Sequence, residues 1–459
     1  MSAYTRLVSG LVFPLQEKLK HHDTVRIRRE LEDSQWWSRE RILGWQAERL
    51  RSLLVAAADV PYWRALFAER QFDPRAVTGV ADLARLPLLD KATIRAHTDA
   101  MKHPQARGLA RFNTGGSSGE PLIFYIGNER VSHDVAAKWR ATRWWGVDIG
   151  DPEIVVWGSP IELGSQDRIR AWRDKLMRTQ LLPAFEMSES KLDGFVARIR
   201  QARPRMLFGY PSALSHIARH AERRGQRMDD LGIRVAFVTS ERLYDNQRAD
   251  IERVFGCRVA NGYGGRDAGF IAHQCPEGGM HLTAEDIVVE IVGEDGRTLP
   301  PGQPGEIVVT HLATRDFPFI RYRTGDVAVT SDAACPCGRG LPLLAEIQGR
   351  STDFVVAQDG TVMHGLSLIY ILRDMPSVQG FRIVQESLDL TRVQVVVAPG
   401  FGSEDESAIV SGFKRRLGSA VDVVVERVAA IPAEKSGKFR YVVSRVPSQV
   451  QAGVAAPHA

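Results

Sequence analysis

The stretch Asn113-Thr-Gly-Gly-Ser-Ser-Gly-Glu-Pro121 places three glycines and three hydroxyl side chains in six consecutive positions, 114–119. Backbone N–H groups and hydroxyls of such a segment can close around phosphate oxygens, because glycine has no Cβ to hold the backbone away. It is not a Walker A loop, since Glu120 stands where Lys followed by Ser or Thr is needed. We therefore expect a phosphate-binding loop built on backbone donors and hydroxyls, with a glycine- and serine-rich surface loop as the alternative.

After this loop, short strand-like runs alternate with longer helical stretches. Leu122-Ile-Phe-Tyr125 is strand-like, and short apolar runs at 153–157, 234–238 and 257–260 indicate buried strands. Longer amphipathic stretches at 190–203 and 212–224 indicate helices between them. Alternation of this kind predicts an α/β architecture built in layers.

Both flanks of the α/β region differ from it. Residues 25–70 show helical periodicity that Pro61 interrupts, whereas residues 282–330 are rich in strands and turns and indicate antiparallel hairpins. A smaller unit of mixed strands and helices follows from about 351, with a strand at 391–397 and a helix at 405–418. Half of the last residues, 448–459, are Ala, Gly or Pro, and the segment indicates a flexible tail.

Composition excludes several classes of protein. The chain has 459 residues, of which 44% are hydrophobic and 25% charged, which is typical of a globular protein with a large core. No apolar run is long enough to span a membrane, and no signal peptide is recognisable, so we expect a cytoplasmic protein. The net charge of +5 is spread along the chain rather than concentrated, which disfavours nucleic-acid binding.

Three further motifs carry chemically useful side chains. Asn261-Gly-Tyr-Gly-Gly-Arg-Asp-Ala-Gly269 offers an aromatic ring for stacking and a carboxylate for a hard cation. Pro318-Phe-Ile-Arg-Tyr-Arg-Thr-Gly-Asp326 ends in a carboxylate that could accept hydrogen bonds from two ribose hydroxyls. Ser436-Gly-Lys-Phe-Arg440 holds a lysine beside glycine that could neutralise charge developing on a phosphate. Each motif alone is weak.

Taken together and in this order, the four motifs resemble the adenylate-forming (acyl-CoA synthetase-like) superfamily. The closer likeness is to its phenylacetate–coenzyme A ligase and CapK-type branch. Further matching stretches lie at 60–63, 86–91, 208–214, 240–241, 335–339 and 347–353, and the resemblance spans roughly residues 30 to 445. It implies a large N-terminal domain at 1–349, which binds ATP and the acid, and a small mobile α+β domain at 350–447.

The resemblance also implies roles for individual residues. The ATP phosphates would be held by Thr114, Gly115, Gly116, Ser117, Ser118 and Gly119. The adenine would be bordered by Ser240, Glu241 and Tyr263, with Gly264 beside them in the nucleotide-binding set. Asp267 would take the place of the family's acidic metal-site residue, which is more usually Glu, so that a bridging water to Mg²⁺ is an alternative to direct contact.

The remaining roles fall near the domain boundary and in the small domain. Asp326 would bind the ribose, with Arg350 nearby, and Asp353 matches the hinge between the two domains. Lys438 matches the lysine of the adenylation step, and Lys435 is its close competitor.

The implied activity is ATP-dependent activation of a carboxylic acid as an acyl-adenylate. Coenzyme A is the first expectation for the acyl acceptor, giving an acyl-CoA thioester. The runner-up is transfer to an amine, a sugar or a carrier protein in polysaccharide or natural-product assembly. A non-catalytic nucleotide-binding protein is a further alternative, and a homodimer is left open. The identity of the acid does not follow from the sequence.

The cysteines support a separate hypothesis. Cys275 and His281 on one side of the hairpin-rich segment, and Cys335 and Cys337 on the other, supply three sulfurs and an imidazole, a workable tetrahedral zinc set. Four protein ligands leave no open position, so such a zinc would be structural. His273 is a rival ligand, and the alternative is a group of unrelated reduced cysteines. Cys257 stands apart as a core cysteine.

Overall fold

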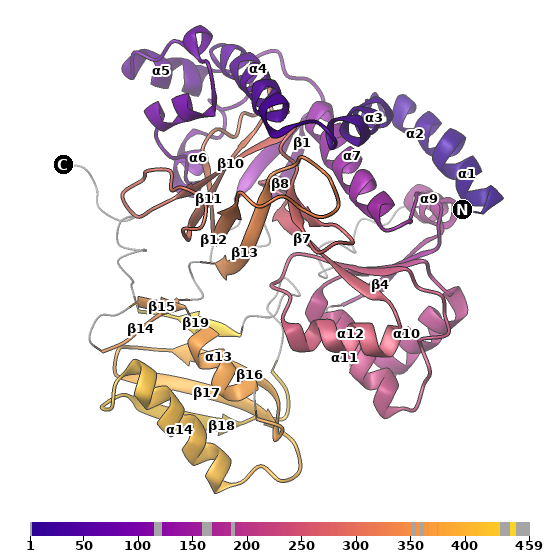
Figure 1. Ribbon diagram of the computed structural model, residues 1–459, viewed down its shortest axis with the longest axis vertical. Helices are drawn as coiled ribbons and strands as arrows, with labels where there is room; N and C mark the ends of the chain where they lie inside the picture. Colours follow the sequence, from indigo (N-terminus) through magenta and orange to yellow (C-terminus); the bar gives the residue numbers. More distant parts are fainter. Residues whose placement is uncertain are drawn as a thin grey trace. The chain divides into compact units, whose positions relative to one another are not determined.

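The computed structural model describes residues 2–113, 122–157, 168–184, 189–350, 354–358, 362–364, 366–373, 375–431 and 441–446. These residues divide into two compact units (Figure 1). The first lies within Met1–Thr324 and Ala328–Ile347, and the second within Gly325–Val327 and Gln348–Ala459. The division along the chain therefore falls between Ile347 and Gln348, and a short piece of one strand, residues 325–327, groups with the second unit.

Helices occupy the beginning of the first unit. Pro61 begins a helix rather than lying inside one, because proline fits the first helical position, where no N–H is needed. The elements are α1 (Ala3–Leu7), η1 (Val8–Val12, a π-helix), α2 (Phe13–Leu19), α3 (Thr24–Ser34), α4 (Arg39–Ala57), α5 (Pro61–Glu69), the 3₁₀ turns η2 (Pro74–Ala76) and η3 (Val80–Arg85), and α6 (Lys91–His97). The helical structure predicted for residues 25–70 is confirmed.

A hairpin frames the glycine- and serine-rich loop. Strands β1 (Ala110–Asn113) and β2 (Ile123–Ile126) pair antiparallel, with Asn113 opposite Ile123. The predicted strand after the loop is therefore confirmed, whereas residues 114–121 lie outside the described part of the chain. Helix α7 (Asn128–Trp144) follows directly.

The centre of the first unit is a sheet in the strand order β10-β11-β12-β13-β9-β8-β7-β6-β5-β3-β4. One half, from β4 to β7, is parallel and agrees with the predicted α/β alternation. Its elements are β3 (Glu153–Trp157), α9 (Arg168–Met177), β4 (Thr179–Pro183), α10 (Glu189–Ala202), β5 (Met206–Gly209), α11 (Pro211–Arg223), β6 (Val235–Val238), α12 (Asp245–Phe255) and β7 (Arg258–Gly265). The chain leaves β3 in one direction to β4 and then returns to β5 on the other side of β3. This reversal is the topological switch of doubly wound folds, where ligands bind at the carboxyl ends of the strands.

The other half of the sheet contains the predicted hairpins. Strands β7 and β8, β8 and β9, β9 and β13, and β10 and β11 pair antiparallel. The elements are β8 (Gly269–Gln274), β9 (Met280–Leu282), β10 (Ile287–Val292), β11 (Gly305–His311), β12 (Tyr322–Ser331) and β13 (Leu343–Arg350).

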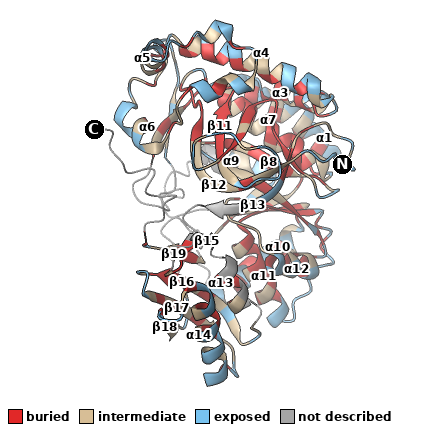
Figure 2. Cartoon of the chain, turned by 60° about the vertical axis from the view of Figure 1, so that its left-hand side comes forward, coloured by how far each residue is buried: buried red, intermediate tan, exposed pale blue. Residues whose placement is uncertain are grey.

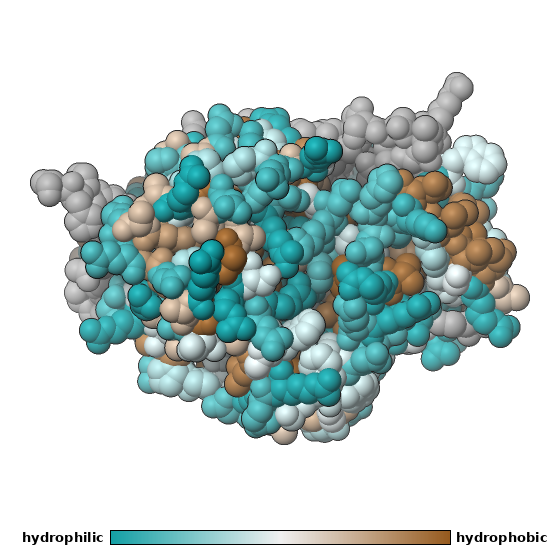
Figure 3. Space-filling model, turned by 90° about the horizontal axis from the view of Figure 1, so that it is seen from above, coloured by the Kyte–Doolittle hydropathy of each residue, from teal (hydrophilic) through white to brown (hydrophobic). Residues whose placement is uncertain are grey.

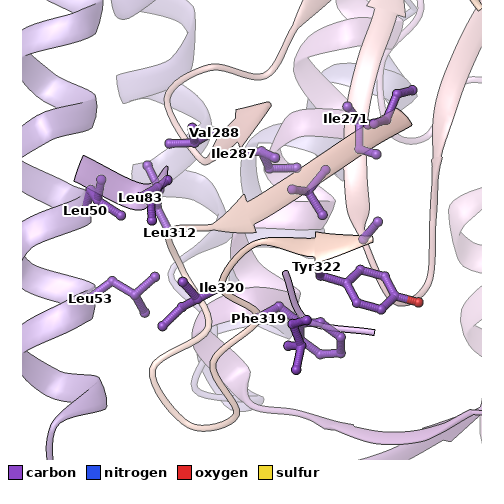
Figure 4. Close-up of a cluster of buried hydrophobic side chains, with 14 of the residues drawn as sticks. Leu50, Leu53, Leu83, Ile271, Ile287, Val288, Leu312, Phe319, Ile320 and Tyr322 are labelled. Atoms are coloured by element: carbon purple, nitrogen blue, oxygen red, sulfur yellow. The ribbon is translucent and has the colours of Figure 1, made fainter. Parts of the chain in front are cut away.

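The distribution of buried residues reflects the packing of helices on the sheet. Buried residues concentrate on the strands and on the helix faces turned toward them (Figure 2). The largest cluster joins α4 to the antiparallel half of the sheet. Leu50 and Leu53 of the helix share this cluster with Ile287, Phe319 and Tyr322 (Figure 4). Among the described helices, none is both long enough and apolar enough to cross a bilayer.

The second unit has its own four-stranded sheet, in the order β18-β17-β16-β19, and a two-stranded pair. The elements are β14 (Phe354–Val356), β15 (Val362–His364), α13 (Leu366–Arg373), β16 (Val378–Gln385), β17 (Leu390–Val397), α14 (Ser403–Leu417), β18 (Asp422–Arg427) and β19 (Val442–Ser444). The predicted strand at 391–397 and helix at 405–418 are confirmed with small shifts at their ends.

Candidate active site

The carboxyl ends of β6 and β7 bring two sequence-predicted residues to one edge of the sheet. Val238, the last residue of β6, pairs in parallel register with Asn261 of β7. Ser240 and Tyr263 each lie two residues beyond that pair, Ser240 in the turn after β6 and Tyr263 in the part of β7 that extends past β6 and pairs with β8. Ser240 has a φ of +71°, a left-handed conformation that non-glycine residues adopt with strain and that is concentrated at functional sites.

Glu241 ties this edge to the next helix. Its Oε2 accepts a hydrogen bond of 3.3 Å from the backbone N–H of Ser212, in the first turn of α11. A carboxylate in the first turn of a helix is favourably placed, since the unpaired N–H groups there carry partial positive charge. The turn after β6 is thereby fixed relative to the turn after β5.

Aromatic rings form a stack beside the topological switch. Trp157, the last residue of β3, stacks on Tyr210 with ring centroids 4.5 Å apart and on Phe208 with centroids 5.8 Å apart. Gly209 lies between the two partners on β5, and a Cβ there would overlap with the carbonyl oxygen of Val156. The sequence does not single out this stack, because Trp157 is more than 50 residues from its two partners and only the parallel pairing of β3 with β5 brings them together.

Asp267 lies in the turn between β7 and β8, and both of its carboxylate oxygens have partners. Oδ2 accepts a hydrogen bond of 2.6 Å from the hydroxyl of Tyr322, and Oδ1 accepts one of 3.1 Å from the N–H of Ala268. Tyr322 is fully buried, and its ring packs edge-on against Phe319 at 5.0 Å. Its hydroxyl points away from the other labelled side chains of the cluster (Figure 4). The carboxylate is therefore oriented by a rigid side chain from β12.

Arg130 of α7 donates hydrogen bonds to the backbone of the same turn. Its Nη2 donates to the carbonyl oxygens of Arg266 and Asp267, at 2.8 and 2.9 Å. The Arg130 side chain is only 2% exposed, so these bonds form where no water competes for the donors. Sequence reasoning missed Arg130, since nothing in the local sequence distinguishes it from the many surface arginines.

A group of buried charges supports Arg130. Asp134, one turn along α7, pairs with Arg130 at 3.4 Å and lies 3.5 Å from His311 Nε2. Burial opposes ionisation of Asp134, but the Arg130 charge and the hydrogen bond with His311 outweigh it and hold the pKa of this carboxyl below its usual value. Burial lowers the pKa of His311, so the ring is neutral at neutral pH.

A second ion pair lies next to the first. Asp286 is 2.7 Å from His133 Nδ1 and 3.1 Å from Arg49 Nη1. Burial raises the pKa of Asp286, yet His133 and Arg49 together lower it far more, so that it stays ionised. His133, which the sequence could not place, therefore belongs to this internal network on α7.

The four predicted metal ligands come together. The ligand atoms of Cys275, His281, Cys335 and Cys337 all lie within 4.8 Å of one another. The Sγ atoms of Cys275 and Cys335 are 3.6 Å apart, and Cys337 Sγ is 3.2 Å from His281 Nε2. Two sulfurs on a tetrahedral zinc, with bonds of about 2.3 Å, lie about 3.8 Å apart. The donor set therefore fits zinc in both chemistry and spacing.

The surroundings of this cluster agree with a metal site. Burial lowers the pKa of His281 to about 4, which keeps the imidazole neutral and able to bind a cation. Gly279 lies against the cluster, and a Cβ there would approach Cys335 Sγ to 2.5 Å. The rival ligand His273 is outside the group and stacks on Phe270 at 5.5 Å, and Cys257 is buried elsewhere.

The remaining predicted residues are only partly placed. Asp326 lies on β12 in the segment that groups with the second unit, and Gly264 lies on β7, where a Cβ would overlap with the carbonyl of Gly269. Arg350 ends β13, and its side chain is outside the described residues. Also outside them are Thr114, Gly115, Gly116, Ser117, Ser118, Gly119, Asp353 and Lys438.

Two family models match different parts of the chain. The one described as AMP-binding enzyme matches residues 181–313, which run from the parallel strands to β11 and include Asp267. The one described as CapK C-terminal domain matches residues 355–445, in the second unit.

Curated relatives extend over most of the chain. Protein CapK of Staphylococcus aureus is 23% identical over 448 residues, which is 96% of each chain. Phenylacetate-coenzyme A ligase of Thermus thermophilus is 25% identical over 85% of this chain and 89% of the relative. The enzyme of the same name from Pseudomonas putida is 28% identical over 68% and 71%.

Solved structures show the same fold. A 2-hydroxyisobutyryl-CoA ligase in the postadenylation state has a TM-score of 0.70 and 21% identity, covering 89% of this chain and 90% of that one. Both family models on one chain and relatives along nearly its whole length support the adenylate-forming superfamily, in the branch of the phenylacetate–coenzyme A ligases and CapK.

Proposed function

We propose that this protein is an ATP-dependent ligase that activates a carboxylic acid as its acyl-adenylate and passes the acyl group to coenzyme A. One observation carries the proposal: an AMP-binding core and a CapK C-terminal domain occur together in a chain that aligns with phenylacetate-coenzyme A ligases over most of its length.

The first half-reaction makes the acid reactive. A free carboxylate is a poor electrophile, because its leaving group would be oxide. One carboxylate oxygen attacks the α-phosphorus of ATP, the bond from that phosphorus to the bridging oxygen breaks, and pyrophosphate leaves. In the second half-reaction the sulfur of coenzyme A, having lost its proton, attacks the acyl carbon, and AMP leaves with the electrons of the cleaved C–O bond.

Asp267 would hold the magnesium ion of the first step. A carboxylate oriented by Tyr322 and by the backbone fits the hard oxygen ligand that Mg²⁺ prefers. When bound, the ion neutralises charge on the phosphates. Arg130 keeps the turn that carries this carboxylate in place through two carbonyl oxygens.

The adenosine would lie beside the carboxyl end of β6, where Ser240 and Glu241 follow the strand and Tyr263 lies on the part of β7 that extends past it. The flat ring of Tyr263 suits stacking on the base, and the carboxylate of Asp326 suits the ribose hydroxyls. In this proposal Thr114–Gly119 hold the phosphates with Arg350 near the ribose, and Lys438 stabilises charge on the reacting phosphate once the small domain has turned about Asp353.

Comparing the two half-reactions tests these roles. Lys438→Ala should abolish acid-dependent pyrophosphate release but leave thioester formation from a synthetic acyl-adenylate largely intact. Lys435→Ala is the matched control and should retain both. Equal loss of both half-reactions in Lys438→Ala would remove the proposed role of this lysine.

A second acceptor class is supported by one specific observation. Protein CapK covers 96% of the chain, and the C-terminal match is also to a CapK domain, so the chain is as similar to CapK as to the coenzyme A ligases. Transfer to an amine, a sugar or a carrier protein stays the alternative second half-reaction. Pyrophosphate release that coenzyme A neither accelerates nor converts into a thioester would favour it.

We also propose that Cys275, His281, Cys335 and Cys337 hold a structural zinc ion. The site would join the turn after β8 to the segment before β13, in the middle of the strand order, where the antiparallel half of the sheet meets β7. Four protein ligands leave no coordination position for a substrate.

A further inference from the structure

The N-terminal helices leave a row of leucines uncovered. Leu7, Leu11, Leu15 and Leu19 follow one another along α1, η1 and α2, and their exposed fractions are 51%, 60%, 56% and 74%. Single exposed leucines are common on proteins, but four at constant spacing on one helical rod form a continuous apolar stripe.

The π-helical turn keeps the four leucines in line. In a regular α-helix, residues four apart drift around the axis by about 40° per step. The wider turn at Val8–Val12 contains more residues per revolution and offsets that drift. The stripe is therefore a consequence of the helix geometry in this segment.

The opposite side of the same rod is firmly docked. Thr5 Oγ1 donates a hydrogen bond of 2.8 Å to the buried carboxylate of Asp151, and Phe13 packs edge-on against Trp139 at 5.1 Å. Val8 is fully buried. Because these contacts fix the rotation of the rod, the leucines face outward in the folded protein.

The apolar surface continues onto α9. The hydroxyl of Tyr4 donates to the carbonyl oxygen of Leu176 at 2.8 Å, which places the end of α9 beside α1. Leu176 is 38% exposed, and Trp172, one turn earlier, is 77% exposed. Figure 3 shows hydrophobic residues gathered at the right of the view, the side on which Figure 1 has α1 and α2.

Cations surround this surface, which we call the leucine face (Tyr4, Leu7, Leu11, Leu15, Leu19, Trp172 and Leu176). The acidic side chains of its two segments are engaged: Glu17 is buried and pairs with His22 and Lys20, and Asp174 pairs with Arg173. The exposed basic residues are Arg6, Lys18, Lys20, Lys175 and Arg178.

We propose that the leucine face binds an anionic lipid surface. An apolar stripe with an exposed tryptophan and flanking lysines and arginines is the pattern of helices that lie in the interface of a membrane. A second copy of this chain fits less well, since a two-fold contact would bring the same cations of both copies together. The proposal concerns adsorption to the surface and is independent of the ligase activity.

Co-sedimentation with vesicles tests the proposal on the full chain. Vesicles of phosphatidylcholine and phosphatidylglycerol in equal parts should bind the wild type, and pure phosphatidylcholine should bind it less. Leu11→Ser/Leu15→Ser should lower binding by roughly tenfold or more, because two inserting side chains are lost. Lys18→Gln/Lys20→Gln should lower it and weaken its dependence on salt.

The control variant also replaces two exposed leucines, but at positions outside the leucine face. Leu43→Ser/Leu388→Ser replaces leucines that are 45% and 39% exposed outside the leucine face, and it should bind as the wild type does. Thermal unfolding should show that all variants are folded. Equal binding by the Leu11→Ser/Leu15→Ser variant would overturn the proposal, and so would a wild-type dimer that this variant dissociates while neither binds vesicles.

Discussion

A single tyrosine sets the orientation of the carboxylate most central to the proposed chemistry. Tyr322 comes from β12, whereas Asp267 comes from the turn after β7, and the hydrogen bond of 2.6 Å between them joins two parts of the sheet. Hydrogen bonds to charged groups contribute about 1.5–3 kcal/mol. If the carboxylate must point at the metal, this bond supports catalysis without touching the substrate.

We predict that Tyr322→Phe reduces the rate of adenylate formation by about 10- to 100-fold, which is that energy range converted to a rate. Raising the Mg²⁺ concentration should recover part of the loss, because the misplaced carboxylate still binds the ion. Tyr62→Phe, a partly buried tyrosine on α5, is the control. Unchanged pyrophosphate release in Tyr322→Phe would show that Asp267 needs no such support.

His311 makes the stability of the network depend on pH. The ring is buried and faces Asp134 and Arg130 of α7 as well as Asp286, and burial is the main cause of its lowered pKa. In the unfolded chain this histidine binds a proton near pH 6.5, whereas in the folded protein it stays neutral to lower pH. Below pH 6.5 the unfolded state therefore holds more protons, and stability falls as the pH falls.

Replacing His311 should make the stability of the protein depend less on pH. Between pH 6.5 and 5, the free energy of unfolding of His311→Gln should change with pH less steeply than that of the wild type. The difference in slope should be up to about 1.4 kcal/mol per pH unit, which is the full effect of one proton. Urea unfolding at several pH values measures it, with the exposed His97→Gln as control. Parallel curves for the wild type and His311→Gln would mean that His311 is protonated in the folded state.

At the scale of elements, the zinc hypothesis concerns how a short strand is held. β9 has only three residues, Met280–Leu282, yet it lies between β8 and β13 in the sheet. His281 belongs to this strand, Cys275 lies in the turn that leads into it from β8, and the pair Cys335 and Cys337 lies in the segment that leads into β13. A metal bound by all four would hold this part of the sheet together.

We predict about one zinc ion per chain by elemental analysis of the purified protein, and a clear fall in the unfolding temperature when a chelator removes it. Cys335→Ser should lose both the zinc and the effect of the chelator. Cys257→Ser, a buried cysteine outside the group, should keep its zinc. Protein free of zinc whose stability is unaffected by Cys335→Ser would remove the hypothesis.

The elements themselves show what sequence can predict. Strands β3, β6 and β17 follow apolar runs bounded by turns, so periodicity alone located them within a residue or two. The cysteine set was also predictable, because ligand type and spacing along the chain carry the information. Arg130 and the stack of Trp157 on Tyr210 were not, because their partners are distant in sequence and only the strand order brings them together.

At the scale of the whole molecule, the two units have separate sheets, and the proposed reaction uses both. Ser240, Glu241, Tyr263 and Asp267 belong to the first unit, whereas Asp326 groups with the second. Family membership follows from the ordered motifs and from matches to both units, but it leaves the acid and the acceptor unspecified. The central claim is therefore a reaction type, and its direct test must vary both substrates.

That test is pyrophosphate release from ATP and Mg²⁺ across aryl, fatty and hydroxy acids, each with and without coenzyme A. The account predicts release that depends on one class of acid, faster turnover with coenzyme A, and a product with the mass of the acyl-CoA thioester. Absence of acid-dependent release from a folded protein that still binds AMP would contradict it, because such a chain would bind the nucleotide without activating an acid.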